Sequence, residues 1–224
     1  KYDAAVASWF VSEVESRALP NQTIETSHKN PGFPQTIEIE ASLMNVLRYG
    51  ENAHQAAAIY RNTAPSAVSG IAQAKQHAGK EMSYNNYLDV DIAWRACRSL
   101  TNGVAIVKHG IPSGVASANS VTDSYRAALA SDPVSAFGGV VAISNGVDGS
   151  CAAAISESFT EVVLAPSFTE EALHIFESKP RVRLLRITND NDSHTHEFDL
   201  KKIDGGYVIQ DQDSLDSEQD RFSS

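Results

Sequence analysis

The chain has 224 residues and a formal net charge of −10, from 18 Lys and Arg against 28 Asp and Glu, and 42% of its residues are hydrophobic. At about 150 residues per domain, this length predicts one large domain or two small ones, with enough apolar material for a packed core. The acidic balance argues against a nucleic-acid scaffold, which normally carries positive charge to meet phosphates, and no apolar run reaches the ~18 residues of a membrane-spanning helix. The two cysteines, Cys97 and Cys151, are far apart in the sequence and favour neither a disulfide scaffold nor a cysteine zinc site. A cytoplasmic location fits these features best.

The first 36 residues predict a short helix followed by a linker. Val6, Trp9 and Phe10 share one face of a helix placed within residues 1–19. Residues 20–36 combine Pro and Gly with polar residues, which is the composition of a linker, and we place a domain boundary at its end.

Beyond the linker, strand-like and helical segments alternate. Ile37 and Ile39 alternate with glutamates and predict a short strand with one solvated face. Further segments are assigned from apolar β-branched runs and from apolar residues on one helical face. In chain order they are a helix at 88–100, a strand at 104–107, a helix at 120–129, strands at 139–143 and 162–164, a helix at 169–176 and a strand at 181–187. Ser120 and Asp123 have the spacing of a capping box, and Thr169 is the expected N-cap of the last helix. This order predicts an α/β layered domain with a largely parallel or mixed sheet flanked by helices.

The last part of the chain is polar. Residues 189–197 predict a loop, and Gly205-Gly206 after Asp204 predict a turn. Acidic residues dominate beyond Gln210, and we expect residues 214–224 to form a solvated, mobile tail.

The strand at 104–107 leads directly into Lys108 and His109, followed by a segment with Gly and Pro that predicts a tight loop. Ligands of α/β sheets bind outside the carboxyl ends of strands, so this segment predicts the corner of an active site. His109 can exchange a proton near neutral pH, and Lys108 can stabilise developing negative charge. A surface lysine beside a partly buried histidine is an equally good interpretation of the pattern.

Three other places carry candidate binding residues. Arg48 offers a planar fork suited to phosphate and Tyr49 a rigid face with a hydroxyl, although both fit a polar loop equally well. Gly138 and its neighbour Gly139 allow the backbone to approach a ligand or another strand closely, or simply form a tight turn. Glu161 could accept hydrogen bonds from a sugar hydroxyl or lie on the surface.

Two polar groups have plain structural interpretations. Asn85 or Asn86 is a natural helix cap. His194 and His196 form an HxH pair in a polar segment without a nearby carboxylate or cysteine pattern, so we expect no metal there. Neither a GxxxxGK[ST] nor a GxGxxG motif is present, which leaves a triphosphate or dinucleotide site unsupported.

Six segments follow one another along residues 40–213: LRYGENAHQ (47–55), MSYNNYLDVDIAW (82–94), VKHGIPSGVA (107–116), SDPVSAFGGVVA (131–142), EVVLAP (161–166) and GGYVIQDQD (205–213). In this order they resemble the bifunctional enzymes of purine biosynthesis that combine phosphoribosylaminoimidazolecarboxamide formyltransferase with IMP cyclohydrolase.

The resemblance implies a cyclohydrolase domain with a methylglyoxal-synthase-like fold, followed by two cytidine-deaminase-like α/β subdomains that lack the catalytic zinc. Residues 1–19 would end the first domain, and residues 37–213 would form the first formyltransferase subdomain. It also implies transfer of a formyl group from the co-substrate 10-formyltetrahydrofolate to 5-aminoimidazole-4-carboxamide ribonucleotide, with no metal. The parent chain would also act as an IMP cyclohydrolase and form a cytoplasmic homodimer without nucleic-acid or membrane partners. We expect the isolated chain to be inactive, because the folate-binding residues of the family lie mainly in the other subdomain.

Matched to the family motifs, His109 would be the proton acceptor and Lys108 would stabilise the transition state. The nucleotide would be held by Arg48 near its phosphate and by Tyr49, with His109 also in contact. The remaining substrate contacts would come from the Gly138 backbone and from Glu161 at the ribose. Asn86 matches an asparagine that lies near the site in the family.

One departure from the family pattern concerns Ile111, which stands where the family commonly has Asn. Isoleucine cannot supply the polar contacts of an asparagine, so the site either tolerates the change or loses activity. A non-catalytic nucleotide-binding or dimerisation module that kept the fold is therefore the alternative. A zinc deaminase is disfavoured, because no HxE with PCxxC occurs.

Overall fold

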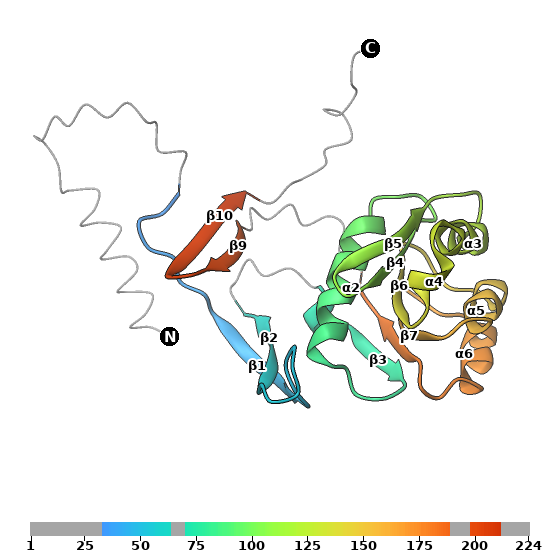
Figure 1. Cartoon of the computed structure of the whole chain (residues 1–224), viewed down its shortest axis with the longest axis horizontal. Coiled ribbons are helices and arrows are strands. Elements are labelled where there is room, and N and C mark those ends of the chain that lie inside the picture. The colour runs from blue at the N-terminus through green and yellow to red at the C-terminus, as the bar shows by residue number, and fades with distance from the viewer. Residues whose placement is uncertain (1–32, 64–69, 189–197, 212–224) are drawn as a thin grey trace, which may run out of the picture. The chain divides into compact units, whose positions relative to one another are not determined.

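The computed structural model describes residues 33–63, 70–188 and 198–211 (Figure 1). Four sequence predictions lie wholly or mostly outside the described residues: the N-terminal helix, the linker at 20–36, the loop at 189–197 with its two histidines, and the acidic tail. The chain's contacts divide it into residues 1–38 and 39–224, and all the elements below belong to the second part. Within the described ranges no helix has the length and hydropathy needed to cross a membrane.

A six-stranded mixed sheet is the centre of the fold. Its strands are β3 (Lys75–Ala78), β4 (Val104–Lys108), β5 (Ile111–Ala116), β6 (Gly139–Ile143), β7 (Thr160–Ala165) and β8 (Arg183–Arg186). They are ordered β3-β8-β7-β6-β4-β5. The neighbours β6, β7 and β8 are parallel, whereas β3, β4 and β5 each pair antiparallel with their neighbours. The predicted layered α/β class with a mixed sheet is confirmed.

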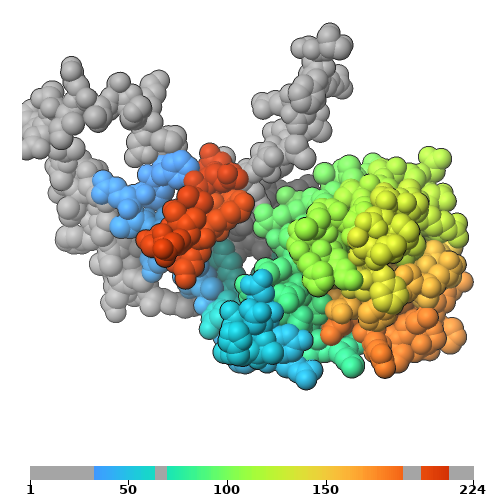
Figure 2. Space-filling view, in the orientation of Figure 1, coloured from blue at the N-terminus to red at the C-terminus, as the bar shows by residue number. Residues whose placement is uncertain are grey.

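Helices cover both faces of this sheet (Figure 1). Helix α2 (Tyr84–Cys97) packs on one face, and α3 (Val121–Ser131), α5 (Gly149–Ser156) and α6 (Glu170–Glu177) pack on the other. Alternate residues of each strand enter the two cores, because successive side chains point to opposite faces. In β4, Val104 and Ile106 join the core with α3, α5 and α6, while Ala105 and Val107 join the core with α2. In the space-filling view the yellow-green to orange segments, which include α3, α5 and α6, form one continuous surface (Figure 2).

Side-chain caps start these helices. Thr169, predicted as a cap, accepts a hydrogen bond from the backbone N–H of Ala172. Ser120 likewise accepts from the N–H of Asp123, as its spacing predicted, and its hydroxyl also donates to the Asp123 carboxylate. The short helix α4 (Pro133–Ala136) begins in the same way at an aspartate cap, with proline at its first position, and the 3₁₀ turn η1 (Ile71–Gln73) follows a glycine.

Two antiparallel ribbons precede and follow the strands of this sheet in the sequence. Strands β1 (Ala41–Leu47) and β2 (Ala57–Asn62) form one, and β9 (Phe198–Ile203) and β10 (Gly206–Asp211) form the other, joined by the predicted turn at Asp204-Gly205. The strand predicted at Ile37 and Ile39 is wrong, because regular pairing begins only at Ala41.

The tight loop predicted after Lys108 is present but shorter than expected, because β5 begins at Ile111, so only His109 and Gly110 separate it from β4 and Pro112 lies in the strand. Pro112 is tolerated there because β5 lies at the edge of the sheet. Ser113 is an extra residue, since Pro112 pairs with Val107 and the next pair joins Gly114 to Ile106. Such a bulge bends an edge strand and interrupts its pairing.

Candidate functional site

Strand ends from β4, β6 and β7 meet at one edge of the sheet. Val107 pairs antiparallel with Val140, and Gly139 pairs parallel with Thr160. The carboxyl end of β4 therefore lies beside the amino ends of β6, β7 and β8. Of the three strands, β4 alone has its carboxyl end at this edge, so the expected carboxyl-end placement of Lys108 and His109 does not extend to Gly138 and Glu161. The rule assumes parallel strands, and β4 runs against its neighbour β6.

Lys108 and Gly138 are brought together at this edge. The half-buried Lys108 donates from Nζ to the carbonyl oxygen of Phe137 at 2.6 Å. Gly138 follows with φ of 72°, and its N–H donates to the carbonyl of Phe159 at 2.8 Å. A Cβ at Gly138 would lie 3.3 Å from the Phe159 ring and 3.9 Å from Lys108 Nζ. The structure thus shows the turn and a close approach of Gly138 to the Phe159 ring, whereas its approach to a ligand stays a prediction.

His109 is exposed at the tip of the β4–β5 hairpin. It has φ of 54°, and Gly110 has φ of 77°, so both residues of the turn are left-handed. The sequence analysis offered a surface lysine beside a partly buried histidine as the alternative. The structure shows the opposite, a partly buried Lys108 beside an exposed His109. The imidazole is therefore accessible to a ligand at this edge.

Asp89 of α2 holds this turn, and the sequence analysis missed it. Its Oδ2 accepts from the N–H of His109 at 3.2 Å, and its Oδ1 accepts from the N–H of Gly110 at 2.7 Å. In the sequence Asp89 resembles its neighbour Asp91, which instead forms an exposed ion pair with Arg95. No local pattern distinguishes the two carboxylates, because their partners are decided by the packing of α2 on the sheet.

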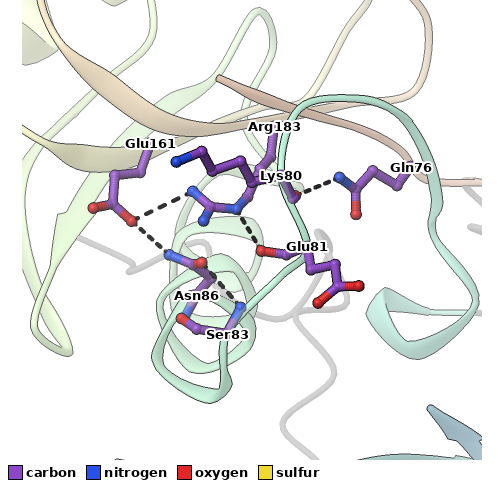
Figure 3. A network of polar contacts seen from close by, with 7 residues as sticks. All are labelled: Gln76, Lys80, Glu81, Ser83, Asn86, Glu161 and Arg183. Carbon is purple, nitrogen blue, oxygen red and sulfur yellow. Dashed lines mark hydrogen bonds and ion pairs between the residues drawn. The ribbon is translucent and has the colours of Figure 1, made fainter. Parts of the chain in front are cut away.

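Glu161, near the start of β7, is held by two partners (Figure 3). Its Oε2 accepts from Nδ2 of Asn86 at 2.9 Å and lies 3.7 Å from Nη1 of Arg183. Arg183 in turn donates from Nε to the carbonyl of Glu81 at 2.9 Å. The Glu161 side chain remains 40% exposed, whereas that of Arg183 is 15% exposed. Both described contacts of Glu161 go to Oε2, and no contact of Oε1 is seen among the described residues.

Asn86 has a second role at the start of α2. The cap of this helix is Ser83, and not Asn85 or Asn86 as predicted. Ser83 Oγ accepts from the Asn86 N–H, and Asn86 Oδ1 accepts from the Ser83 N–H, which is a capping box. The amide nitrogen of Asn86 is then free to hold Glu161. Figure 3 also shows Gln76 donating to the carbonyl of Lys80 in the segment that leads into α2, at 2.7 Å.

Arg48 and Tyr49 lie in the loop between β1 and β2. The guanidinium carbon of the exposed Arg48 is 5.8 Å from the centre of the Tyr49 ring, within the range of a cation–π contact. Asn85, at the start of α2, donates from Nδ2 to the carbonyl of Glu51 in this loop at 3.4 Å. The loop is thus tied to the helix that also contacts Glu161 and His109.

The cysteines do not belong to this site. Cys97 and Cys151 are free, fully buried and lie in the cores on opposite faces of the sheet. Burial raises the pKa of each thiol to about 12, so neither is a thiolate nucleophile at neutral pH. Over residues 33–63, 70–188 and 198–211, no cluster of three His, Cys, Asp or Glu side chains could hold a metal ion.

The whole chain, residues 1–224, matches the family model of the AICARFT/IMPCHase bienzyme. The chain belongs to this family. It is also 40% identical over 222 residues to the bifunctional purine biosynthesis protein PurH of Polynucleobacter necessarius subsp. necessarius (strain STIR1). The matched region is 96% of this chain and 40% of that relative, so the chain spans well under half of the relative's length. The resemblance found in the motifs is confirmed.

In this AICARFT/IMPCHase chain, four of the six motif segments supply the residues at the sheet edge. They are 82–94 with Asn86 and Asp89, 107–116 with Lys108 and His109, 131–142 with Gly138, and 161–166 with Glu161. Arg183 lies outside every motif segment, so no signal in the sequence pointed to it.

Proposed function

We propose that this chain forms the nucleotide-binding part of a formyltransferase site in purine biosynthesis. The reaction would move a formyl group from 10-formyltetrahydrofolate to the 5-amino group of 5-aminoimidazole-4-carboxamide ribonucleotide. The observation that supports it most is the placement of Lys108, His109 and Gly138 beside a fixed carboxylate, Glu161, at one edge of the sheet. Strands β4 and β7 are separated only by β6, so their axes lie about 10 Å apart, a distance that a nucleotide can span.

The chemistry requires a base and a cation. The 5-amino group is a weak nucleophile, because its lone pair is delocalised into the ring and the carboxamide. As its nitrogen attacks the formyl carbon, the exposed His109 would take the proton that the nitrogen loses. The C–N10 bond of the folate then breaks, its electron pair passes to N10, and N10 takes up a proton.

Lys108 is suited to the oxyanion that forms in this step. An ammonium has three N–H donors, and one of them is used by the carbonyl of Phe137 at 2.6 Å. Two remain for the oxygen of the tetrahedral intermediate. Because the Phe137 contact fixes the position of Nζ before substrate binds, little reorganisation would be needed during the reaction.

The nucleotide itself would be held at two further points. Oε1 of Glu161 would accept from the ribose hydroxyls, since its other oxygen is bound to Asn86. Arg48 would bind the phosphate through its planar fork, with Tyr49 beside it.

The other expectations from the sequence stay predictions. They are the folate co-substrate, the IMP cyclohydrolase activity of a longer parent chain, the homodimer and the cytoplasmic location. The family name, AICARFT/IMPCHase bienzyme, and a relative named a bifunctional purine biosynthesis protein, of which this chain spans 40%, support a second activity in a longer parent chain.

Two experiments test the proposed function. Calorimetric titration of this chain with the ribonucleotide, with and without the folate, should show binding of the nucleotide alone. In a protein of the relative's full length that carries this sequence, His109→Asn should reduce formyl transfer by about 100-fold or more, because a general base contributes about that factor. Asparagine tolerates the left-handed backbone of the turn, so the fold should be kept.

The matched control is His174→Asn on α6, an exposed histidine on a helix that packs on the opposite face from α2. It should leave transfer unchanged, and His109→Ala should behave like His109→Asn. Wild-type turnover by both His109 variants would show that His109 is not the base. Nucleotide binding without any transfer by the unaltered protein would favour the non-catalytic module.

A further inference from the structure

We propose that Asp89 is a positioning residue that holds the β4–β5 turn and thereby directs His109 toward the substrate. This inference rests on the proposed function, because it concerns the base of the same reaction. It is carried by two hydrogen bonds from consecutive backbone N–H groups to the two oxygens of a single carboxylate, at 3.2 Å and 2.7 Å.

The turn needs such an anchor because of its backbone geometry. Two-residue hairpins with positive φ at both turn positions strongly prefer Asn-Gly or Asp-Gly, and here His109 occupies the first position. A left-handed conformation is unfavourable for an ordinary L-residue, because its Cβ comes too close to the following carbonyl oxygen. A histidine at this place therefore gains from a contact that fixes its backbone from outside the hairpin.

The carboxylate of Asp89 supplies that contact. Hydrogen bonds from N–H groups to an ionised acceptor are about twice as strong as bonds between neutral groups. Both oxygens of Asp89 are used, one for His109 and one for Gly110, so the carboxylate resists rotation of either peptide. The imidazole itself stays exposed and available to a ligand.

Helix α2 connects this anchor to the carboxylate of the proposed ribose site. Asp89 follows Asn86 by three residues, so both lie on one face of the helix. Asn86 holds Glu161, and Asp89 holds the turn with His109. The helix is itself fixed to the sheet by Val90 and Ala93, which are fully buried. One rigid element thus sets the distance between the base and the residue that would bind the ribose.

Amide exchange and kinetics together test this inference. In Asp89→Ala we expect amide hydrogen exchange at His109 and Gly110 of this chain, measured by NMR, to accelerate by about tenfold or more. In the longer protein that carries this sequence, the same change should lower kcat for formyl transfer by about 10- to 100-fold, the range for loss of a hydrogen bond to a charged group. KM for the ribonucleotide should change by less than about threefold, because Asp89 does not touch the nucleotide in this proposal.

Asp91→Ala is the matched control, since it removes the same charge from the same helix two residues later. Asp91 pairs with the exposed Arg95 at 2.9 Å. This control should change neither the two exchange rates nor kcat. The isosteric Asp89→Asn keeps one acceptor oxygen, so its exchange rates and kcat should lie between those of Asp89→Ala and the unaltered protein. It replaces Asp89→Ala in the test if urea unfolding shows that Asp89→Ala is unstable.

The outcomes separate this inference from the proposed function. If His109→Asn abolishes transfer while both Asp89 variants keep wild-type kcat, the positioning role is wrong and the base assignment stands. If the exchange of the two amides does not change in the Asp89 variants, the positioning role is wrong as well. If the variants of His109 and of Asp89 all keep wild-type transfer, the base assignment and the positioning role are both wrong, while the transfer activity stands. Absence of transfer by the unaltered longer protein would instead overturn the proposed function.

Discussion

Asn86 and Glu161 are 75 positions apart in the sequence and are joined by a hydrogen bond of 2.9 Å (Figure 3). The asparagine is 5% exposed, and its remaining polar groups close the first turn of α2. Glu161 is therefore held by a side chain that cannot move without opening the helix. A carboxylate fixed in this way is preorganised for a ligand, which costs less binding free energy than ordering a free side chain.

Glu161→Gln should weaken binding of the ribonucleotide by about 10- to 100-fold, because hydrogen bonds to a charged acceptor are stronger than bonds to an amide. Titration calorimetry on this chain measures the change. The free energy of unfolding should fall by about 1 kcal/mol or less, since the ion pair with Arg183 is partly solvated. Glu177→Gln, at an exposed position of α6, is the control and should leave affinity unchanged. Equal affinities for all three proteins would exclude Glu161 from the nucleotide site.

Gly138→Ala should destabilise the chain more than Gly110→Ala, although the two glycines have nearly the same φ of 72° and 77°. In each variant the left-handed backbone of the alanine should lower the free energy of unfolding by about 1–2 kcal/mol. At Gly138 the new Cβ also meets the Phe159 ring at 3.3 Å, whereas at Gly110 the nearest atom is a methyl of Ile92 at 3.9 Å. Urea unfolding compares the two variants. Losses of the same size would mean that the Phe159 ring moves aside at no cost.

Ile111→Asn should change the free energy of unfolding by no more than about 0.5 kcal/mol, because Ile111 is 69% exposed on an edge strand. Formyl transfer by the longer protein should rise or stay the same, since the asparagine is the residue common in the family. Val115→Asn on the same strand, where the side chain is 41% exposed, should cost more stability without raising activity. A large loss of activity in Ile111→Asn would reveal a role for the isoleucine in this site.

Asp148 should make the stability of α5 depend on pH. It caps the helix by accepting from the Cys151 N–H and the Ser150 hydroxyl, each at 2.8 Å, and these bonds hold its pKa below the ordinary 3.8. Because the pKa is lower in the folded chain, the stabilisation is complete above the unfolded value and is lost as the pH falls through the folded one.

The measurement is urea unfolding at a series of pH values. Asp148→Ala should cost about 1 kcal/mol at pH 7, and its difference from the unaltered chain should shrink as the pH falls below about 3.8. Asp148→Asn keeps a good cap without a titrating group, so it should lose little at pH 7. A constant difference between Asp148→Ala and the unaltered chain across this range would show that the charge of Asp148 does not contribute.

The strands of the central sheet that the sequence analysis did not predict, β3 and β5, have largely exposed residues. Strands β6 and β7 are buried almost throughout, and their apolar runs predicted them, β6 with its observed bounds Gly139–Ile143. In contrast β3 is exposed along its length, and β5 lies at the sheet edge with Pro112 in its sequence. Their residues show no alternation of apolar and polar side chains that would distinguish a strand from a loop. They are strands because their backbones pair with one neighbouring strand, and not because their side chains are buried.

The sequence by itself determined the inner strands, the cap at Thr169 and the family, because each depends on residue types at short spacing. Tertiary structure alone decided which strand ends share an edge, since the direction of β4 is set by its pairing with β6. It also selected Asp89 over Asp91 as the partner of the His109 turn. The physical reason is the same in both cases. A hydrogen bond between groups 20 or more positions apart depends on how helix and sheet pack, and local sequence does not encode that packing.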